Sequence, residues 1–432
     1  MKNSTGLVKF FYPLLLIIPV ILVFSVDTVN PTYYKFAKSY GIAAITLGLF
    51  QLVLSSRNKI LDRLFGYPNV LILHSLNAKI VLLFAIAHPT MIFFSYINDF
   101  KFDLRQIIES ITFPYWLGVI ALTGLLVTVF GAMYSGKLKL KYEFWKKLHR
   151  FIYLILIIVL VHAFLLGSDF LHRNVVFYYV LGFIILAVLS FLDRYFHIFG
   201  KKIYEYTVTE VKKQNNEVFS YILHPANNSK ALKYNPGQFV FTHFYDSHVP
   251  KEEHHFTISG YSEDGEVMLT VKKVGDYTKI LPDITKGSNV KLEGPYGNLS
   301  VVRYGPPYVF IAAGIGITPS FSNLLYLEEK NALKNAFLIL SNKIYKDIVF
   351  KDDLSRLKKK GLKTAFFLTQ EKRLNYINSR IDARLLKKIL KGKKGATYFV
   401  TGGQEFVLEI EKQLIEIGIK RYKINKEIFS LK

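Results

Sequence analysis

The sequence contains no cysteine among its 432 residues. This absence excludes disulfide bonds, thiolate metal sites and thiol nucleophiles. Acidic residues are also scarce, because 32 Asp and Glu face 56 Lys and Arg and leave a net charge of +24. A basic excess can indicate nucleic-acid binding, but much of it here borders long apolar stretches, where it attracts anionic lipid. We therefore expect a lipid bilayer as a partner and no nucleic acid.

Apolar residues are abundant but largely confined to the first half of the chain. They dominate up to about residue 199, and an ordinary mixed sequence begins after Lys201. A helix needs about 20 apolar residues to cross a bilayer, and six stretches reach or approach that length: 10–26, 36–55, 70–97, 112–134, 149–167 and 175–199. Lysine and arginine are concentrated on the connections that share a side with the amino terminus, which predicts that this side is cytoplasmic. The chain is therefore expected in the cell membrane, with its second half in the cytoplasm.

The second half predicts two soluble domains. Between residues 203 and 298, short strands alternate with turn signals, which is typical of an antiparallel β-barrel or a β-sandwich. From residue 307 on, strands alternate with helices, which indicates an α/β domain with a parallel sheet. The predicted fold is a six-span membrane α-helical bundle (1–200), an antiparallel β-barrel domain (201–300) and an α/β nucleotide-binding domain (301–432).

Two of the apolar stretches carry two histidines each. His74 and His88 are 14 residues apart on one stretch, and His149 and His162 are 13 residues apart on another. A single histidine in an apolar helix is usually a hydrogen-bonded packing residue, but ionisable groups inside a membrane are costly and mostly functional. With a rise of about 1.5 Å per residue, the two separations are about 21 and 20 Å. Imidazoles at matched depths on two helices predict two bis-histidine haems, one above the other.

The predicted topology assigns these histidines to two levels. Both stretches run outward from the cytoplasm, so His74 pairs with His149 (the inner pair) and His88 pairs with His162 (the outer pair). Fourteen residues return to the same face of a helix in a left-handed bundle, but thirteen residues fall about 100° short. The fifth stretch must therefore tilt or bend to present both of its histidines. Arg150 is expected either to neutralise a haem propionate or to snorkel at the helix end.

A glycine-rich turn joins the first strand of the α/β domain to its first helix. It reads Gly314-Ile315-Gly316-Ile317-Thr318-Pro319. Glycines let the backbone approach a pyrophosphate, and a helix amino terminus favours its negative charge. A glycine pair alone is as often only a tight turn, so the position at a strand-to-helix junction is what favours nucleotide binding.

The soluble half resembles the ferredoxin–NADP reductase family in five short motifs, which are, in order, Pro236-Gly237-Gln238-Phe239, His254-His255-Phe256-Thr257-Ile258-Ser259, Gly275-Asp276-Tyr277-Thr278, Gly294-Pro295-Tyr296-Gly297 and the glycine-rich turn. With the apolar stretches and paired histidines in front, the whole chain resembles the bacterial NADPH oxidase and ferric reductase family. The segment from Tyr142 to Arg150 is similar to the entry of that family's second haem helix. The resemblance implies FAD, two b-type haems and NADPH or NADH as cofactors.

The resemblance also implies roles for individual residues. It places Thr257 beside the flavin ring in a catalytic position, with His254 and Phe256 lining the flavin. Phe429 is implied to be the catalytic aromatic residue that shields the flavin until nicotinamide displaces it, and the alternative is a packed tail residue. The other implied cofactor contacts are Ser259, Lys272, Gly275, Thr278, Gly314, Gly316, Thr318, Lys343, Thr401 and Gly402.

Three positions depart from the family pattern. His255 stands where the family usually has proline, and Thr401 stands where it usually has cysteine near the nicotinamide. Lys343 stands where an arginine often holds the 2′-phosphate of NADPH. A lysine binds phosphate only as a point charge, so NADPH is favoured only slightly over NADH.

These features predict transmembrane electron transfer from cytoplasmic NAD(P)H, through FAD and two haems, to a small-molecule acceptor outside the cytoplasm. Oxygen, giving superoxide, is the expected acceptor. Ferric chelate, a quinone and an extracytoplasmic partner protein are the alternatives. A rival from another class is a transporter or sensor whose histidines relay protons and whose soluble half only binds nucleotide. No obligatory protein partner is expected.

Overall fold

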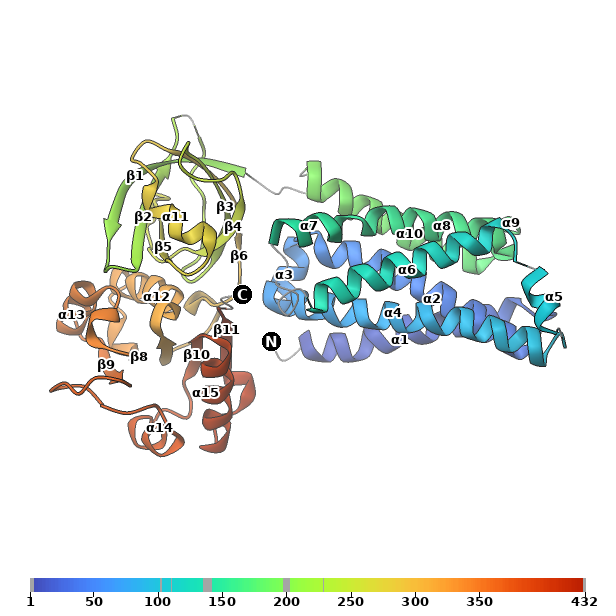
Figure 1. Cartoon of the computed structure of the whole chain (residues 1–432). Coiled ribbons are helices and arrows are strands. Elements are labelled where there is room, and N and C mark those ends of the chain that lie inside the picture. Colours follow the sequence, from blue (N-terminus) through green and yellow to red (C-terminus); the bar gives the residue numbers. More distant parts are fainter. Residues whose placement is uncertain are drawn as a thin grey trace. The chain divides into compact units, whose positions relative to one another are not determined.

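The computed structural model describes residues 4–101, 103–109, 111–134, 142–196, 203–227 and 229–429. The chain divides into two units, Met1–Phe199 and Gly200–Lys432. The first unit is helical, and the second contains two β-sheets with helices packed on them (Figure 1).

The first unit consists of long helices that run side by side (Figure 1). The helices are α1 Ser4–Val26, α2 Thr32–Ser55, α3 Lys59–Phe65, α4 Tyr67–Asn98, α5 Leu104–Glu109, α6 Phe113–Tyr134, α7 Tyr142–Arg150, α8 Ile152–Leu166, α9 Ser168–Leu171 and α10 Val175–Phe196. Large apolar side chains such as Ile72, Trp116 and Phe196 are exposed on their surface. Water disfavours so much exposed apolar surface and a lipid environment favours it, so this unit is built to lie in a membrane.

Five helical segments within the described ranges are long and apolar enough to cross a bilayer: Thr32–Ser55, Tyr67–Asn98, Phe113–Tyr134, Phe144–Leu166 and Val175–Phe196. They correspond to the second to sixth predicted spans. The first predicted span, 10–26, lies within the 23-residue helix α1, in which Tyr12–Val26 is counted as a shorter apolar segment. A sixth span therefore stays a prediction.

Helix α2 is the most enclosed helix of this unit. It packs against α1, α4 and α10. In its most apolar 18-residue stretch 61% of the residues are buried, against 22% or less in the four other segments. The buried cluster that joins α1, α2 and α10 consists of Val23, Ile42, Ile45, Leu49, Val176, Val180 and Ala187. Most side chains of α2 therefore contact protein instead of lipid.

The fifth predicted span, 149–167, is not one continuous helix, because it is broken between α7 and α8. At Phe151 the backbone N–H bonds to a carbonyl three residues back, instead of four. The two segments on either side of this break need not share one helical phase. This irregularity lies between His149 and His162, whose thirteen-residue spacing puts them out of phase on a straight helix.

The second unit begins with a curled antiparallel sheet in the strand order β4-β3-β6-β1-β2-β5. Its strands are β1 Ile203–Lys213, β2 Val218–Pro225, β3 Phe239–Tyr245, β4 Glu253–Thr257, β5 Val267–Lys272 and β6 Asn289–Tyr296. Alternate residues of these strands build a shared core that includes Tyr206, Tyr221 and Phe244. Residues at the two edge strands meet at the isolated bridge Ile258–Leu269. The structure therefore shows a curled sheet where the sequence predicted a barrel.

The rest of the second unit is a parallel sheet in the order β11-β10-β7-β8-β9, with helices on both faces. Its elements are β7 Tyr308–Ala313, α12 Ile317–Glu329, β8 Ala336–Asn342, α13 Lys351–Lys359, β9 Lys363–Leu368, α14 Ala383–Ile389, β10 Thr397–Gly402, α15 Gln404–Glu416 and β11 Ile424–Ile428. Phe310 and Leu338 join the core shared with α12 and α13, whereas Val309 and Ile339 join the core shared with α14 and α15. Burial on both faces explains why these strands are continuous apolar runs.

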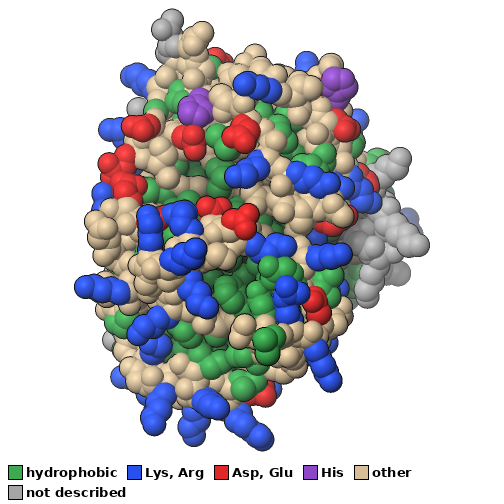
Figure 2. Space-filling view, turned by 90° about the vertical axis from the view of Figure 1, so that its left-hand side faces the viewer, with side chains coloured by type: hydrophobic (Ala, Val, Ile, Leu, Met, Phe, Trp, Pro, Cys, Tyr) green, Lys and Arg blue, Asp and Glu red, His purple; other side chains and the backbone are tan. Residues whose placement is uncertain are grey.

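Figure 2 shows lysine and arginine side chains scattered over one face, with acidic side chains and apolar surface between them. Dispersed, solvated lysines of this kind are typical of an ordinary protein surface.

Candidate functional site

A cavity of about 550 Å³ lies between the helices of the first unit, and all four histidines of the two pairs line it. The ring centres of His74 and His149 are 6.2 Å apart, with 57° between the ring planes. The ring centres of His88 and His162 are 6.3 Å apart, with 85° between the planes. The structure therefore brings the histidines together in the two combinations expected from the sequence.

These separations match two imidazoles bound to one metal atom. A metal–imidazole nitrogen bond is about 2.0–2.1 Å in zinc proteins, so rings that bind one ion of similar size from opposite sides have centres about 6 Å apart. No three His, Cys, Asp or Glu side chains converge as a metal site in the part of the chain that the structure describes. A haem needs only two axial side chains, so the donor set present fits a haem at each pair.

The outer pair is oriented by main-chain carbonyls. His88 Nδ1 lies 2.8 Å from the Ala37 carbonyl oxygen, and His162 Nδ1 lies 2.8 Å from the Pro114 carbonyl oxygen. A carbonyl only accepts, so each Nδ1 carries the proton and donates. Each Nε2 is then left as a lone-pair donor, which is the tautomer that a metal-binding histidine adopts.

Two glycines make room for the outer rings. A Cβ at Gly41 would lie 3.0 Å from His88 Nδ1, and a Cβ at Gly118 would lie 2.7 Å from His162 Cε1. Any larger residue would push the imidazole out of its present position. Neither position was predicted from the sequence, where the available signal was a glycine inside each of two apolar helices that pack beside a histidine helix.

The inner pair has different surroundings. The Nδ1 atoms of His74 and His149 are buried and have no hydrogen-bond partner among the described residues. Gln51 Nε2 donates to the backbone carbonyl of His74 at 2.7 Å, and Asn77 Nδ2 donates to Gln51 Oε1 at 2.6 Å. The Tyr12 hydroxyl in turn donates to Asn77 Oδ1. This polar chain therefore reaches the backbone of His74 and leaves its ring without a partner.

The opposite end of the cavity carries a buried ionic cluster. Lys38 Nζ lies 2.9 Å from a carboxylate oxygen of Asp27 and 2.9 Å from one of Asp169. Lys38 and Asp169 line the cavity. The hydroxyl groups of Tyr96 and Tyr115, which also line it, are 2.8 Å apart. Charged groups are costly in a membrane and are mostly functional there, so this end is a candidate for contact with an acceptor.

In the second unit, strand β4 places the predicted flavin residues on two faces. His254 stacks on Tyr277, with ring centres 3.7 Å apart, and Phe256 lies on the same side of the strand at 6.4 Å from His254. His255 points the other way and packs against aromatic residues of β3. Thr257 is buried at the end of the strand. His255 thus does not share a face with the residues expected to line the flavin.

Four further predicted flavin contacts lie around the same sheet. The hydroxyl of Thr278 accepts hydrogen bonds from the N–H groups of Val274 and Gly275, at 2.9 Å each, and so holds the start of the short helix α11 (Asp276–Ile280). Lys272 is exposed at the end of β5. Ser259 is fully buried, and its hydroxyl bonds to the Met268 carbonyl and to the Thr270 hydroxyl. The Ser259 side chain is therefore committed to the protein core.

The glycine-rich turn and the end of β10 are locked together. A Cβ on Gly316 would lie 2.7 Å from the Thr401 carbonyl oxygen and 2.8 Å from Gly402 Cα. The Thr401 hydroxyl donates to the Gly316 carbonyl at 2.6 Å. Gly314 has a φ of +54°, which favours glycine. The hydroxyl that replaces the expected thiol is thus fully buried and fastens the turn.

The remaining predicted residues surround the carboxyl edge of the parallel sheet, where nucleotides bind in such folds. The Phe429 N–H donates to the Gly402 carbonyl at 2.8 Å, which places Phe429 next to the end of β10. Thr318 is buried in the first turn of α12 and bonds to the Ile315 carbonyl at 3.1 Å. Lys343 is exposed immediately after β8. These positions belong to elements whose ends meet at one edge.

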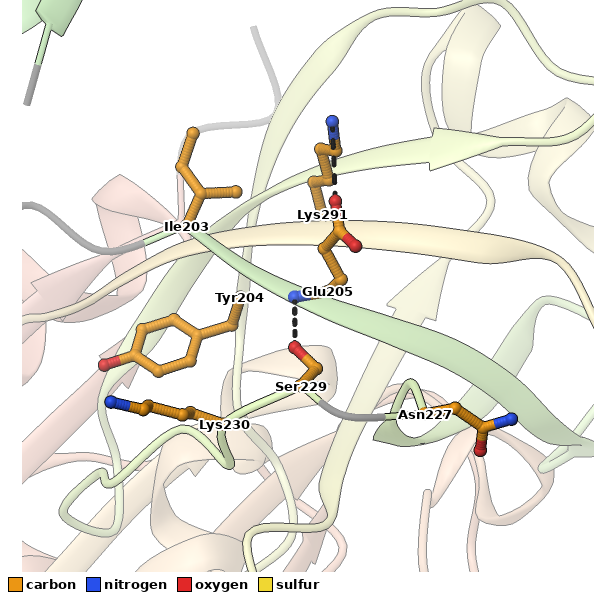
Figure 3. Close-up of a pocket in the computed structure, with 7 residues that line it drawn as sticks. All are labelled: Ile203, Tyr204, Glu205, Asn227, Ser229, Lys230 and Lys291. Atoms are coloured by element: carbon orange, nitrogen blue, oxygen red, sulfur yellow. Dashed lines mark hydrogen bonds and ion pairs between the residues drawn. The ribbon is translucent and has the colours of Figure 1, made fainter.

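A second cavity, of about 580 Å³, lies on the curled sheet and is lined by Ile203, Tyr204, Glu205, Asn227, Ser229, Lys230 and Lys291. Figure 3 shows the Lys291–Glu205 ion pair and the Ser229 hydroxyl that accepts from the Glu205 N–H. None of the predicted flavin or nucleotide residues lines it. This second cavity is therefore distinct from the predicted cofactor sites.

Three segments of the chain match known families. Residues 40–160 match a ferric reductase like transmembrane component, residues 203–308 match an FAD-binding domain, and residues 310–412 match an oxidoreductase NAD-binding domain. His74, His88 and His149 lie within the first match, and His162 lies two residues beyond its end. The flavin and nucleotide motifs lie within the second and third matches.

Individual relatives are distant. A flavohemoprotein from Vibrio cholerae is 24% identical over 233 residues, which are 52% of this chain and 58% of that protein. The sulfhydrogenase 2 gamma subunit from Pyrococcus furiosus is 28% identical over 167 residues, which are 37% of this chain and 56% of that protein. The chain thus spans about three fifths of the flavohemoproteins it matches.

One solved structure can be superimposed along most of the chain. The flavohemoglobin of Malassezia yamatoensis, solved with bound FAD and haem, is 20% identical and gives a TM-score of 0.53 over 92% of this chain and 97% of that one. At this identity the likeness concerns the fold alone.

Proposed function

We propose that this chain, an oxidoreductase with the domain architecture of the NADPH oxidase and ferric reductase-like proteins, transfers electrons from NAD(P)H through FAD and two haems across a membrane to oxygen. Electron transfer driven by NAD(P)H follows from the matched domains. Transfer of the electrons across the membrane is the part of the proposal that goes beyond the matched domains. Its main support is that two histidine pairs, with ring centres 6.2 and 6.3 Å apart, line one cavity among apolar helices.

In the helical unit, His74 and His149 would hold the inner haem, and His88 and His162 would hold the outer haem. Bound FAD supplies the conversion from two-electron hydride chemistry to single electrons, and bound haem supplies one-electron carriage. Bis-histidine ligation occupies both axial positions of the iron and so disfavours direct binding of a substrate. The hydrogen bonds of His88 and His162 to main-chain carbonyls orient the two rings for ligation.

In the soluble unit, the predicted cofactor residues orient the flavin and the nucleotide and keep the flavin ring covered. Gly314 and Gly316 bring the backbone close to a nucleotide pyrophosphate. Thr257 and Phe256 line the flavin, and Phe429, held by its backbone next to β10, covers the flavin ring until nicotinamide takes its place. No residue on this side has to act as a general acid or base, because a hydride carries its own electron pair.

Oxygen is the proposed acceptor because it is small and uncharged and needs access to the outer end of the cavity only. That end is lined by Tyr34, Lys38, Tyr96 and Tyr115. Since the outer iron would have no vacant position, oxygen would be reduced near the haem edge and leave as superoxide. The distribution of basic residues supports a cytoplasmic location of the soluble unit.

The haem sites are tested by absorbance spectra of the purified full-length protein. A b-type bis-histidine spectrum is expected, and the double replacement His88→Ala with His162→Ala should remove the outer contribution and leave the inner one. His172→Ala is the matched control, because His172 is not among the residues that line the cavity. Full retention of both haems in the double variant would contradict the assignment.

The acceptor is tested by NAD(P)H consumption in reconstituted vesicles. We expect reduction of cytochrome c that superoxide dismutase abolishes. Reduction of ferric chelate that persists without oxygen, together with no superoxide, would make the chain a metalloreductase. Nucleotide binding without any NAD(P)H oxidation or haem spectrum would favour the transporter or sensor alternative.

A further inference from the structure

Glu252, His254 and Tyr277 form a cluster at the edge of the curled sheet. We propose that Glu252 is a positioning residue that prepares the His254 imidazole to take up a proton when FAD binds, so that the positive ring balances the negative charge of the FAD pyrophosphate. The inference rests on the proposed function, because it presupposes FAD beside His254. It adds one residue and one proton to the account of FAD binding.

The carboxylate of Glu252 orients the His254 ring. Glu252 directly precedes strand β4, and its Oε2 lies 3.0 Å from His254 Nε2. An ionised carboxylate only accepts hydrogen bonds, so Nε2 carries a proton and donates it. The other ring nitrogen, Nδ1, has no hydrogen-bond partner among the described residues. With a second proton at Nδ1, the ring would be positive and would have one donor left for a ligand.

The contact with Tyr277 also favours a positive ring. The ring centres of His254 and Tyr277 are 3.7 Å apart and the planes are inclined by 15°, so the rings lie nearly face to face. Neutral aromatic rings avoid this arrangement and prefer offset or edge contacts, with centres about 4.5–7 Å apart. A cation is attracted to the face of a tyrosine ring. Glu252 and Tyr277 therefore both stabilise the imidazolium form of His254.

Among the groups packed around this ring, His254 itself is the one whose charge changes near neutral pH. Burial raises the pKa of Tyr277, and the charge of Glu252 raises it further, so the hydroxyl stays protonated. Strand β3 contributes Thr242, whose hydroxyl donates to the His254 carbonyl at 3.1 Å. Helix α11 carries two charged side chains, which are exposed to solvent: Asp276 and Lys279.

Charge balance links the proton to the cofactor. FAD carries negative charge on its pyrophosphate, and a carboxylate close to it is repelled unless a positive group compensates. The His254 side chain is bonded to that carboxylate and is still 27% exposed, so it is open to a ligand. An imidazolium interacts favourably with both anions, whereas a neutral imidazole leaves Glu252 opposing FAD. Protonation of His254 from solvent and binding of FAD should therefore favour each other to the same extent.

The test is calorimetric titration of the purified, flavin-depleted full chain with FAD, from about pH 6 to about pH 9, around the range in which histidine titrates. Two buffers of different ionisation enthalpy at each pH give the number of protons taken up. We expect uptake that approaches one proton per FAD within this range, with an affinity that falls by up to about tenfold per pH unit as the pH rises. FAD binding with no proton uptake and a constant affinity would overturn the inference. A parent chain that binds no FAD at any pH would instead refute the proposed function.

Two variants assign the proton to this cluster. Glu252→Gln keeps a hydrogen-bond acceptor but removes its charge, and a charged acceptor holds a donor about tenfold better than a neutral one. The fall in FAD affinity should therefore occur about one pH unit lower in Glu252→Gln than in the parent. His254→Asn should bind FAD without proton uptake. If either variant does not fold, the proton count of the unmodified chain still decides the matter.

Glu253→Gln is the matched control. Glu253 is the next residue of the chain, and its carboxylate lies 3.9 Å from His243 instead of facing His254. This variant should keep the proton uptake and the pH profile of the parent. A Glu252→Gln profile identical to that of the parent would overturn the inference. A uniform loss of FAD affinity at every pH would overturn it too, because it would show that Glu252 has only a structural role.

Discussion

Replacement of Gly316 by alanine tests whether the nucleotide turn and the end of β10 act as one rigid element. The backbone φ of Gly316 is −59°, which alanine adopts without strain, so the cost comes from contact alone. The new Cβ would lie 2.7 Å from the Thr401 carbonyl oxygen and 2.8 Å from Gly402 Cα. Both contacts are with backbone, which cannot rotate away as a flexible side chain does. Overpacking of this kind costs about 1–3 kcal/mol, and we expect the upper part of that range.

The same displacement should reach the proposed site. Thr401 bonds back to the Gly316 carbonyl, and Gly402 accepts from the Phe429 N–H, so the turn, the end of β10 and Phe429 must move together. At about 2–4 °C per kcal/mol for a domain of this size, the melting temperature of the soluble unit should fall by roughly 5–10 °C. The KM for NAD(P)H should rise at the same time.

The assay combines thermal unfolding with NAD(P)H-dependent flavin reduction in the full chain. Gly305→Ala is the matched control, because its added Cβ would meet nothing within 4 Å. A Gly316→Ala variant with the melting temperature and KM of the parent would refute the reasoning. A lower melting temperature with an unchanged KM would show that the turn is structural and does not bind the nucleotide.

Three further predictions concern the soluble unit. Thr401→Val leaves the Gly316 carbonyl without its hydroxyl donor and should cost about 1–3 kcal/mol of unfolding free energy, whereas Thr401→Ser should restore it; chemical denaturation measures both. Hydrogen bonds from the Ser288 hydroxyl and the His248 N–H lower the pKa of Asp246, so its contribution to stability is present above its unfolded pKa of about 4 and is lost as the pH falls below that value. The difference in melting temperature between the parent and Asp246→Asn should therefore shrink as the pH is lowered from about 5 to about 3. A difference that stays constant over this range would contradict the prediction. Lys343→Ala should raise the KM for NADPH about tenfold, as loss of one charged contact does, and leave that for NADH unchanged; equal effects on both would exclude a 2′-phosphate contact.

Regular patterns carried most of what could be predicted from the sequence. The spacing of the histidines and the predicted direction of their helices indicated which histidines share a level, since matched depth depends only on these two quantities. Strand and helix alternation predicted the parallel sheet, and the glycines of the turn indicated its position. These features depend on residues that are close in the sequence, so they can be recognised without a structure.

Features that depend on three-dimensional packing could not be predicted. The irregular hydrogen bond at Phe151 has no signal such as proline or glycine in the sequence around it. The hydrogen-bond partners of the Ser259 hydroxyl lie on the facing strand β5. The partner of Thr401 lies 85 residues away, beyond the reach of any local pattern. The polar chain through Gln51 and Asn77 was detectable only as amide side chains in apolar helices, without any indication of what they contact.

The break between α7 and α8 also bears on how the two proposed haems would bind. His88 and His162 are pinned by carbonyls of α2 and α6, so the outer site is preorganised and loses little freedom on binding. His149 is carried on the separate segment α7, and its ring has no hydrogen-bond partner among the described residues. Under the proposed function, a bound haem would therefore complete the inner site. When haemin is limiting, the first product of reconstitution should be a half-loaded chain with haem at the outer pair.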